Sequence, residues 1–257
     1  MSPAAGPIAA SGLADSVIKR PEDWEKLLVL DPAEGWLAEH VRSIRLVREA
    51  LGPDVLILES LFSPLTVAHK MSLHLPFEES VREHRASLEA GLRAIAAGTK
   101  RFAEAALAAG ADGFFFATQE ASRDGLSEAD FLALGKRYDL EVLDAIADGR
   151  AFNLLHVCRV NIMADLVVDY PVHAINWDSQ CTCPSLVEAR CIWKQALVGG
   201  LDRNGVIVTG TPAEVAADVR RAIAEGGRRG YVVGAGCGLP VARPDANLVA
   251  DSQAVDF

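Results

Sequence analysis

Short apolar runs alternate along the chain with longer stretches whose apolar residues recur every three or four positions. The longer pattern predicts amphipathic helices, and the short runs predict buried strands. Strands are predicted at 54–58, 111–117, 151–156, 172–177, 195–201 and 231–234. Helices are predicted over 21–51, 78–109, 127–148, 160–168, 184–194 and 212–225. This alternation indicates parallel strands covered by helices, so we expect an α/β fold of about six strand–helix units.

The length of 257 residues suits one (β/α) barrel domain. Six units are two fewer than a closed eight-stranded barrel contains, and no clean strand pattern precedes residue 54. We therefore expect a TIM-type (β/α) barrel that is truncated at its N-terminus. Residues 1–20, rich in Ala, Gly, Ser and Pro at their start, are expected to be a flexible segment, and residues 21–257 a single domain.

Composition narrows the classes of partner. The formal net charge is −10 and there is no basic cluster, which argues against nucleic acid and anionic membranes as partners. No run of about 18 apolar residues is present, so no membrane span is predicted. The N-terminal segment lacks the basic and apolar regions of a signal peptide, which favours a cytoplasmic location. There the five cysteines are expected to stay reduced and free to act as ligands or nucleophiles.

Polar side chains follow the predicted strands at their carboxyl ends, where the active face of a (β/α) barrel lies. His156 and Cys158, two positions apart at a strand end, are expected to point the same way. Cys237 follows the last predicted strand within a glycine-rich run at 234–238. One imidazole and two thiolates are a good zinc set, and three protein ligands leave a coordination position open, as in catalytic sites. The alternative reading, buried cysteines that only fill space and a hydrogen-bonded histidine, stays open.

The motif His156-x-Cys158 followed by Gly236-Cys237-Gly238 resembles the zinc motif of the corrinoid-linked methyltransferases of the uroporphyrinogen decarboxylase superfamily. Residues 61–68, 109–113, 176–178, 199–202 and 210–215 are also similar to that superfamily, over roughly residues 20–250. The resemblance implies a (β/α)8 barrel with His156, Cys158 and Cys237 as Zn²⁺ ligands. It further implies a thiol substrate and a methyl group carried by a corrinoid, which a partner protein would hold.

Two other functions remain open at this point. A decarboxylase acting on a tetrapyrrole or another carboxylated substrate would bind it through arginines such as Arg123, Arg159, Arg203 or Arg243. Against this, Cys237 stands where that branch has a glycine-flanked histidine, and its early arginine-rich segment has no counterpart here. A non-catalytic binding remnant would be an open barrel that associates with itself, and a homo-oligomer is expected.

Further residues are expected to line the site. Asp178, Asn176, Glu120 and Asp202 lie at strand ends and are candidate catalytic groups, with Asp178 or Glu120 as a fourth, acidic ligand. Arg159 and Trp177 are candidates for contact with cofactor or substrate, and Arg159 stands where the resemblance would place a small residue. Cys181 and Cys183 are expected to be loop residues, with a place in the site or a redox pair as the alternatives. Cys191 is expected to be buried packing, and His69 a surface or loop residue.

Overall fold

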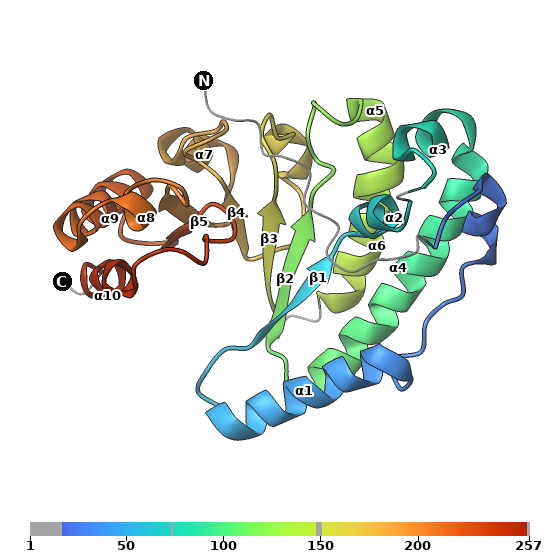
Figure 1. Ribbon diagram of the computed structural model, residues 1–257, viewed down its shortest axis with the longest axis horizontal. Helices are drawn as coiled ribbons and strands as arrows, with labels where there is room; N and C mark the ends of the chain where they lie inside the picture. The colour runs from blue at the N-terminus through green and yellow to red at the C-terminus, as the bar shows by residue number, and fades with distance from the viewer. Residues whose placement is uncertain (1–16, 73, 148–150, 256–257) are drawn as a thin grey trace.

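The computed structural model describes residues 17–72, 74–147 and 151–255. Six strands form one sheet in chain order, each parallel to its neighbours (Figure 1). They are β1 (Leu58–Phe62), β2 (Gly113–Thr118), β3 (Phe152–Val157), β4 (Ala174–Trp177), β5 (Ala196–Leu201) and β6 (Tyr231–Ala235). The expected α/β architecture of six strand–helix units is confirmed.

The helices lie before, between and after these strands. Around β1 are η1 (Pro21–Lys26), α1 (Gly35–Leu51), α2 (Pro64–Met71), α3 (Phe77–Glu83) and α4 (Arg85–Ala108). Between β2 and β4 are α5 (Glu128–Asp130), η2 (Phe131–Lys136), α6 (Arg137–Ile146) and η3 (Ala164–Val167). The last are α7 (Leu186–Ile192), α8 (Val206–Thr209), α9 (Pro212–Gly226) and α10 (Asp245–Gln253). In the described part of the chain no helix is both long and apolar enough to cross a bilayer.

Side-chain caps fix where the helices begin after each strand. Ser63 accepts a hydrogen bond from the Thr66 amide and is followed by Pro64, which suits the first turn of α2. Capping boxes start α7 and α9, the latter between Thr211 and Glu214. Capped first turns thus start α2, α7 and α9, and the carboxyl ends of the parallel strands lie together at one end of the sheet (Figure 1).

Two boundaries differ from the sequence prediction. The first strand is Leu58–Phe62 and not 54–58, because Arg48 binds the carbonyl of Val55 and the side chain of Asp112, which holds the preceding residues in a turn. The helix predicted over 78–109 is broken at His84, whose ψ of 34° is not helical.

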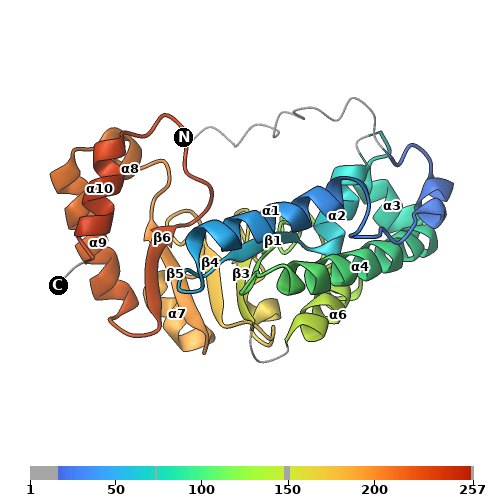
Figure 2. The ribbon, with the colours of Figure 1, turned by 90° about the horizontal axis from the view of Figure 1, so that it is seen from below.

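Figure 2 shows α1 running beside α4.

The expected flexible N-terminal segment was too long by a few residues. Ile18 is fully buried in the main hydrophobic core, and its amide donates to the Met71 carbonyl at 3.1 Å. The ordered domain therefore includes residues before 21. The rest of the predicted segment, residues 1–16, lies outside the described residues.

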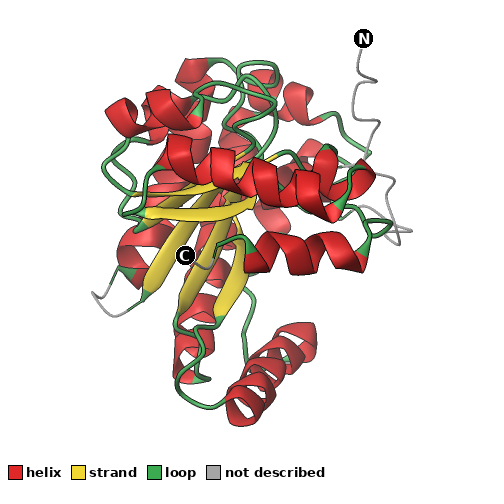
Figure 3. Cartoon of the chain, turned by 90° about the vertical axis from the view of Figure 1, so that its left-hand side faces the viewer, coloured by secondary structure: helices red, strands yellow, loops and turns green. Residues whose placement is uncertain are grey.

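The sheet is twisted and has helices packed around it (Figure 3), and its two faces differ in burial. One face packs under the helices and is fully buried at Phe114, Leu155 and Ile175. The other carries His156 and Asn176, which are register partners, and is open to solvent toward the edges of the sheet. Within the described residues β1 and β6 each pair on one side only, so the sheet does not close.

Candidate metal centre

The end of β3 supplies two side chains to the site. His156 is 5% exposed and stacks on Phe115 of β2, with ring centroids 5.2 Å apart. The Cys158 amide donates to the Thr118 carbonyl at 2.9 Å, which extends the parallel ladder one residue past β3. His156 and Cys158 therefore project from the same side of the sheet.

The third side chain comes from the loop after β6. Gly236 lies against the backbone of Asp178, and a Cβ at this position would overlap it. Only glycine allows so close an approach. This contact draws the β6 loop toward β4 and brings Cys237 over the end of β3.

The three side chains converge on one point. Their ligand atoms all lie within 4.8 Å of one another, and the Cys158 and Cys237 sulfur atoms are 4.0 Å apart. Two thiolates bound tetrahedrally to zinc at about 2.3 Å would stand about 3.8 Å apart, which is close to the observed spacing. The donor set and its spacing therefore fit a zinc ion.

Asn176 orients the histidine. Its amide nitrogen donates to the carbonyls of Val198 and Ala235, at 2.9 and 3.1 Å, which turns its oxygen toward His156. That oxygen lies 2.6 Å from His156 Nδ1, so Nδ1 carries the proton. Nε2 is then the nitrogen left for a metal, the arrangement that metal-binding histidines usually have.

The two thiols share a proton unequally. The Cys158–Cys237 hydrogen bond, and after it the neighbouring His156, lowers the pKa of Cys237 well below its ordinary value. The same Cys158–Cys237 hydrogen bond, together with burial, raises the pKa of Cys158. One proton of the pair is therefore lost more readily than the other. A metal ion would displace the second proton, so its affinity falls with falling pH.

Glu120 is held by two partners and does not belong to the ligand cluster. It is 5% exposed, and its Oε1 lies 2.9 Å from His69 Nδ1 and 3.6 Å from the guanidinium of Arg159. His69 is on α2 and stacks against Phe77 with ring centroids 4.5 Å apart. The sequence interpretation of His69 as a surface residue missed this contact, because α2 was not predicted.

Asp178 lies beside the Cys237 loop. One carboxylate oxygen, Oδ2, is 3.9 Å from Arg203, whereas Oδ1 is buried and accepts no hydrogen bond from the described residues. Asp202 is half-buried, and its side chain accepts from the amide of Asn204 in the turn that follows β5. Neither acidic candidate for a fourth ligand, Asp178 or Glu120, belongs to the described group of three, although Asp178 lies directly beside Gly236 of the Cys237 loop.

Two residues lie elsewhere than the sequence suggested. Trp177 is 0% exposed, packs edge-to-face on Trp193 and donates its indole N–H to the Pro184 carbonyl at 2.7 Å. It lies on the helix-covered face of β4, opposite Asn176, because successive strand residues alternate sides. Cys191 was expected to be buried within its helix, and this was wrong: it is exposed on α7.

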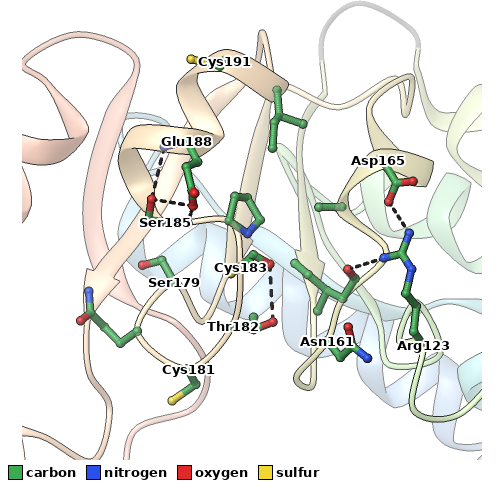
Figure 4. Close-up of a pocket in the computed structure, with 15 residues that line it drawn as sticks. Arg123, Asn161, Asp165, Ser179, Cys181, Thr182, Cys183, Ser185, Glu188 and Cys191 are labelled. Atoms are coloured by element: carbon green, nitrogen blue, oxygen red, sulfur yellow. Dashed lines mark hydrogen bonds and ion pairs between the residues drawn. The ribbon is translucent and has the colours of Figure 1, made fainter.

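A cavity of about 1020 Å³ opens at the same end of the sheet, between the loops that follow β3 and β4 (Figure 4). Cys181, Cys183 and Cys191 are at its lining, and the sulfur atoms of Cys181 and Cys191 lie on opposite sides of it (Figure 4). Among the described residues they form no group that could hold a metal ion. Arg123 at its rim is bound to Asp165 at 2.7 Å. The cavity does not include the three candidate ligands.

The chain is similar in sequence and in fold to known methyltransferases. The chain is 22% identical over 233 residues to the methylcobamide:CoM methyltransferase MtbA of Methanosarcina acetivorans, covering 90% of this chain and 67% of that protein. A solved methyltransferase from Methanosarcina mazei superposes with a TM-score of 0.81 at 23% identity, covering 93% of this chain and 70% of the other.

A more distant structure has the same type of fold. A putative vitamin-B12 independent methionine synthase from Listeria monocytogenes superposes with a TM-score of 0.56 at 14% identity, covering 84% of this chain and 67% of the other. The family model for uroporphyrinogen decarboxylase (URO-D) matches residues 6–256. The expected superfamily is thereby confirmed, and this chain belongs to the uroporphyrinogen decarboxylase family.

Proposed function

We propose that this protein is a zinc-dependent methyltransferase that moves a methyl group from a corrinoid, held by a partner protein, to a thiol. The observation that carries the proposal is the convergence of His156, Cys158 and Cys237 within 4.8 Å at the carboxyl end of the sheet. Three protein ligands leave room for a substrate sulfur. The likeness to MtbA, whose name specifies a methylcobamide and CoM, supports the two substrate classes.

Each residue has a role in this reaction. His156, Cys158 and Cys237 would hold zinc, which when bound supplies a Lewis acid that favours the thiolate form of a substrate at neutral pH. Asn176 fixes the ring of His156 through the 2.6 Å contact at Nδ1. In the transfer, the substrate sulfur forms a bond to the methyl carbon while the carbon–cobalt bond breaks, and that electron pair leaves with the corrinoid.

We assign the three acidic residues different roles. Asp178, with its buried and unpartnered Oδ1, is the one we assign as a fourth ligand or as the acceptor of the thiol proton. Asp202 would serve at the rim of the site, because it is half-buried and bound to its own turn. Glu120 is committed to His69 and Arg159 and would act through them.

The decarboxylase alternative gains no support from the arginines that it requires. Arg123, Arg159 and Arg203 are each paired with a different carboxylate, namely Asp165, Glu120 and Asp178. Arg243 binds the Pro240 carbonyl. A tetrapyrrole with several carboxylates needs cations that converge on one surface, and three of these arginines instead face three separate acids.

A direct assay tests the proposal. Zinc-reconstituted protein is mixed with methylcobalamin and CoM, and demethylation of the cobalamin is followed by its visible spectrum, with the methylated thiol detected by mass spectrometry. Both changes are expected with wild type and not with Cys237→Ser or zinc-free protein. Absence of both with fully zinc-loaded wild type, across several thiols and with methylcobalamin in excess, would contradict the proposal.

A further inference from the structure

We propose that Arg159 selects the substrate by binding an anionic group carried by the thiol, and that Glu120 and His69 are positioning residues for its guanidinium. The inference rests on the proposed function, since it concerns the thiol that would bind beside Cys158. The observation behind it is the chain of contacts that links α2, the end of β2 and the residue after β3.

The backbone at Arg159 points to a role for its side chain. Arg159 directly follows the candidate ligand Cys158 and has a φ of 77°, in the left-handed region. Residues with a Cβ rarely adopt this conformation, and glycine adopts it without strain. An arginine kept in a position that favours glycine indicates that the guanidinium is used.

The guanidinium of Arg159 is near one carboxylate, but its N–H donors are not taken up by it. It lies 3.6 Å from Glu120 Oε1, an ion-pair distance that is too long for a hydrogen bond, and the side chain is 49% exposed. No other ion pair of Arg159 occurs among the described residues. Its N–H donors thus remain for a ligand, and a guanidinium binds a carboxylate or sulfonate through two of them.

His69 allows Arg159 to move from Glu120 to a substrate anion. A buried carboxylate left without a partner is costly, so Arg159 could not leave Glu120 if it were the sole partner. His69 Nδ1 lies 2.9 Å from the same oxygen, and stacking on Phe77 fixes its ring. Glu120 therefore keeps one partner while Arg159 turns to the substrate.

The surrounding charge limits the ligand to one acidic group. The chain carries a formal net charge of −10, and the nearby Arg203 already faces Asp178 at 3.9 Å. One half-exposed guanidinium beside Cys158 can offset a single anion in this acidic field, but not several. The chemistry that fits is a short thiol with one carboxylate or sulfonate.

The test compares two thiols of equal length, 3-mercaptopropionate and 3-mercapto-1-propanol. Each is titrated into protein reconstituted with Co²⁺ in place of zinc, and binding is followed by the cobalt absorption bands, which respond to an added sulfur ligand. The ratio of the two dissociation constants measures the preference for the acid. This ratio does not depend on how much of the protein is folded.

Wild type is expected to prefer the acid by about tenfold, the size of a charge-assisted contact at a partly exposed site. Arg159→Gly, which suits the backbone, should bring the ratio near one, and Arg159→Lys should keep part of it. Glu120→Gln and His69→Ala should lower the ratio, and His69→Gln, which can still donate to Glu120, should lower it less. Arg137→Gln, a surface pair on α6 with Glu141, is the control and should not change it.

Two results would overturn the inference: a ratio near one in wild type, or a ratio that stays unchanged in Arg159→Gly. Both leave thiol binding at the metal intact, so they do not touch the proposed function. If neither thiol changes the cobalt spectrum, the proposed function itself fails, and the inference fails with it.

Discussion

The candidate metal centre joins two unequal parts of the molecule. His156 and Cys158 come from β3, in the middle of the sheet, beside a large core that includes Phe114, Leu155 and Ile175. Cys237 comes from the loop after β6, an edge strand whose Val232 is exposed, beside a second and much smaller core. A metal ion bound by both parts would tie the small core to the large one.

The two sides of the site also differ in rigidity. The β3 side is rigid, because the ring of His156 stacks on Phe115 and its Nδ1 is hydrogen-bonded to Asn176. The β6 side relies on Gly236 to approach Asp178, and on a strand paired on one side only. The stability of the β6 side should therefore depend on the metal far more than that of the β3 side.

The largest expected effect is the loss of the metal link. Zinc at about 100 times its dissociation constant should stabilise wild type by about 2.7 kcal/mol, because it binds the folded state. The Cys158→Ser/Cys237→Ser double variant should bind no zinc and show no such gain. Thermal unfolding with and without zinc measures this, and an equal gain in the double variant would place the zinc elsewhere.

The second effect concerns the large core alone. Asp139 of α6 is fully buried beside the Tyr170 hydroxyl, at 2.9 Å, and burial raises its pKa from 3.8 to about 8. The folded state thus keeps a proton that the unfolded state releases above about pH 4. Stability should fall as pH rises through this window, by about 1.4 kcal/mol per pH unit at most, and level off above pH 8.

Asp139→Asn removes this dependence. The free energy of unfolding of the variant, measured in urea, should exceed that of wild type by a margin that grows by about 2.6 kcal/mol between pH 5 and pH 7. Zinc should not alter the margin, because Asp139 belongs to the large core. A margin that is constant with pH would show that Asp139 is ionised in the folded protein.

A smaller effect is expected at the residue that orients His156. Asn176→Ala removes the 2.6 Å contact to Nδ1 and the two bonds that tie β4 to Val198 and Ala235. Loss of such a partner typically weakens metal binding by about 10–100-fold. Competition with a zinc indicator measures the affinity, and Asn153→Ala, on the same sheet but outside the site, is a matched control. An unchanged zinc affinity in Asn176→Ala would mean that zinc binding does not depend on the hydrogen bond between Asn176 and the His156 ring.

The smallest effect is on local motion. Zinc should slow amide hydrogen exchange in residues 231–238 by about tenfold, and change exchange in β3 little, because β3 is already held by neighbours on both sides. Exchange followed by mass spectrometry on peptides from the two segments gives the comparison. Equal slowing in both would contradict the division into a rigid and a metal-dependent side.

Much of this fold could be predicted from the sequence, for a physical reason. Strands buried under helices are continuous apolar runs, and β2 to β6 lie within one or two residues of their predicted places. The first strand was misplaced, because Val55 and Leu56 read as apolar core but lie exposed in the turn that Arg48 and Asp112 hold. A contact between residues 64 positions apart leaves no local pattern.

In the site too, local patterns could be predicted, whereas contacts between residues far apart in the sequence could not. The pairing of His156 with Cys158 follows from strand periodicity, and Cys237 from the glycines around it together with the family resemblance. The place of His69 could not be predicted, because its partner Glu120 is 51 residues away and a helical pattern does not specify it. Trp177 could not be assigned to a face without the register of β4, in which Asn176 and not Trp177 faces His156.

The central claim is that one metal ion is held by an imidazole and two thiolates and accepts a substrate sulfur. X-ray absorption at the zinc edge of the loaded protein tests it most directly. The account predicts two sulfur ligands at about 2.3 Å with nitrogen or oxygen completing four, and a third sulfur after CoM is added. A sulfur count that stays at two in saturating CoM, or a count below two at the start, would contradict it.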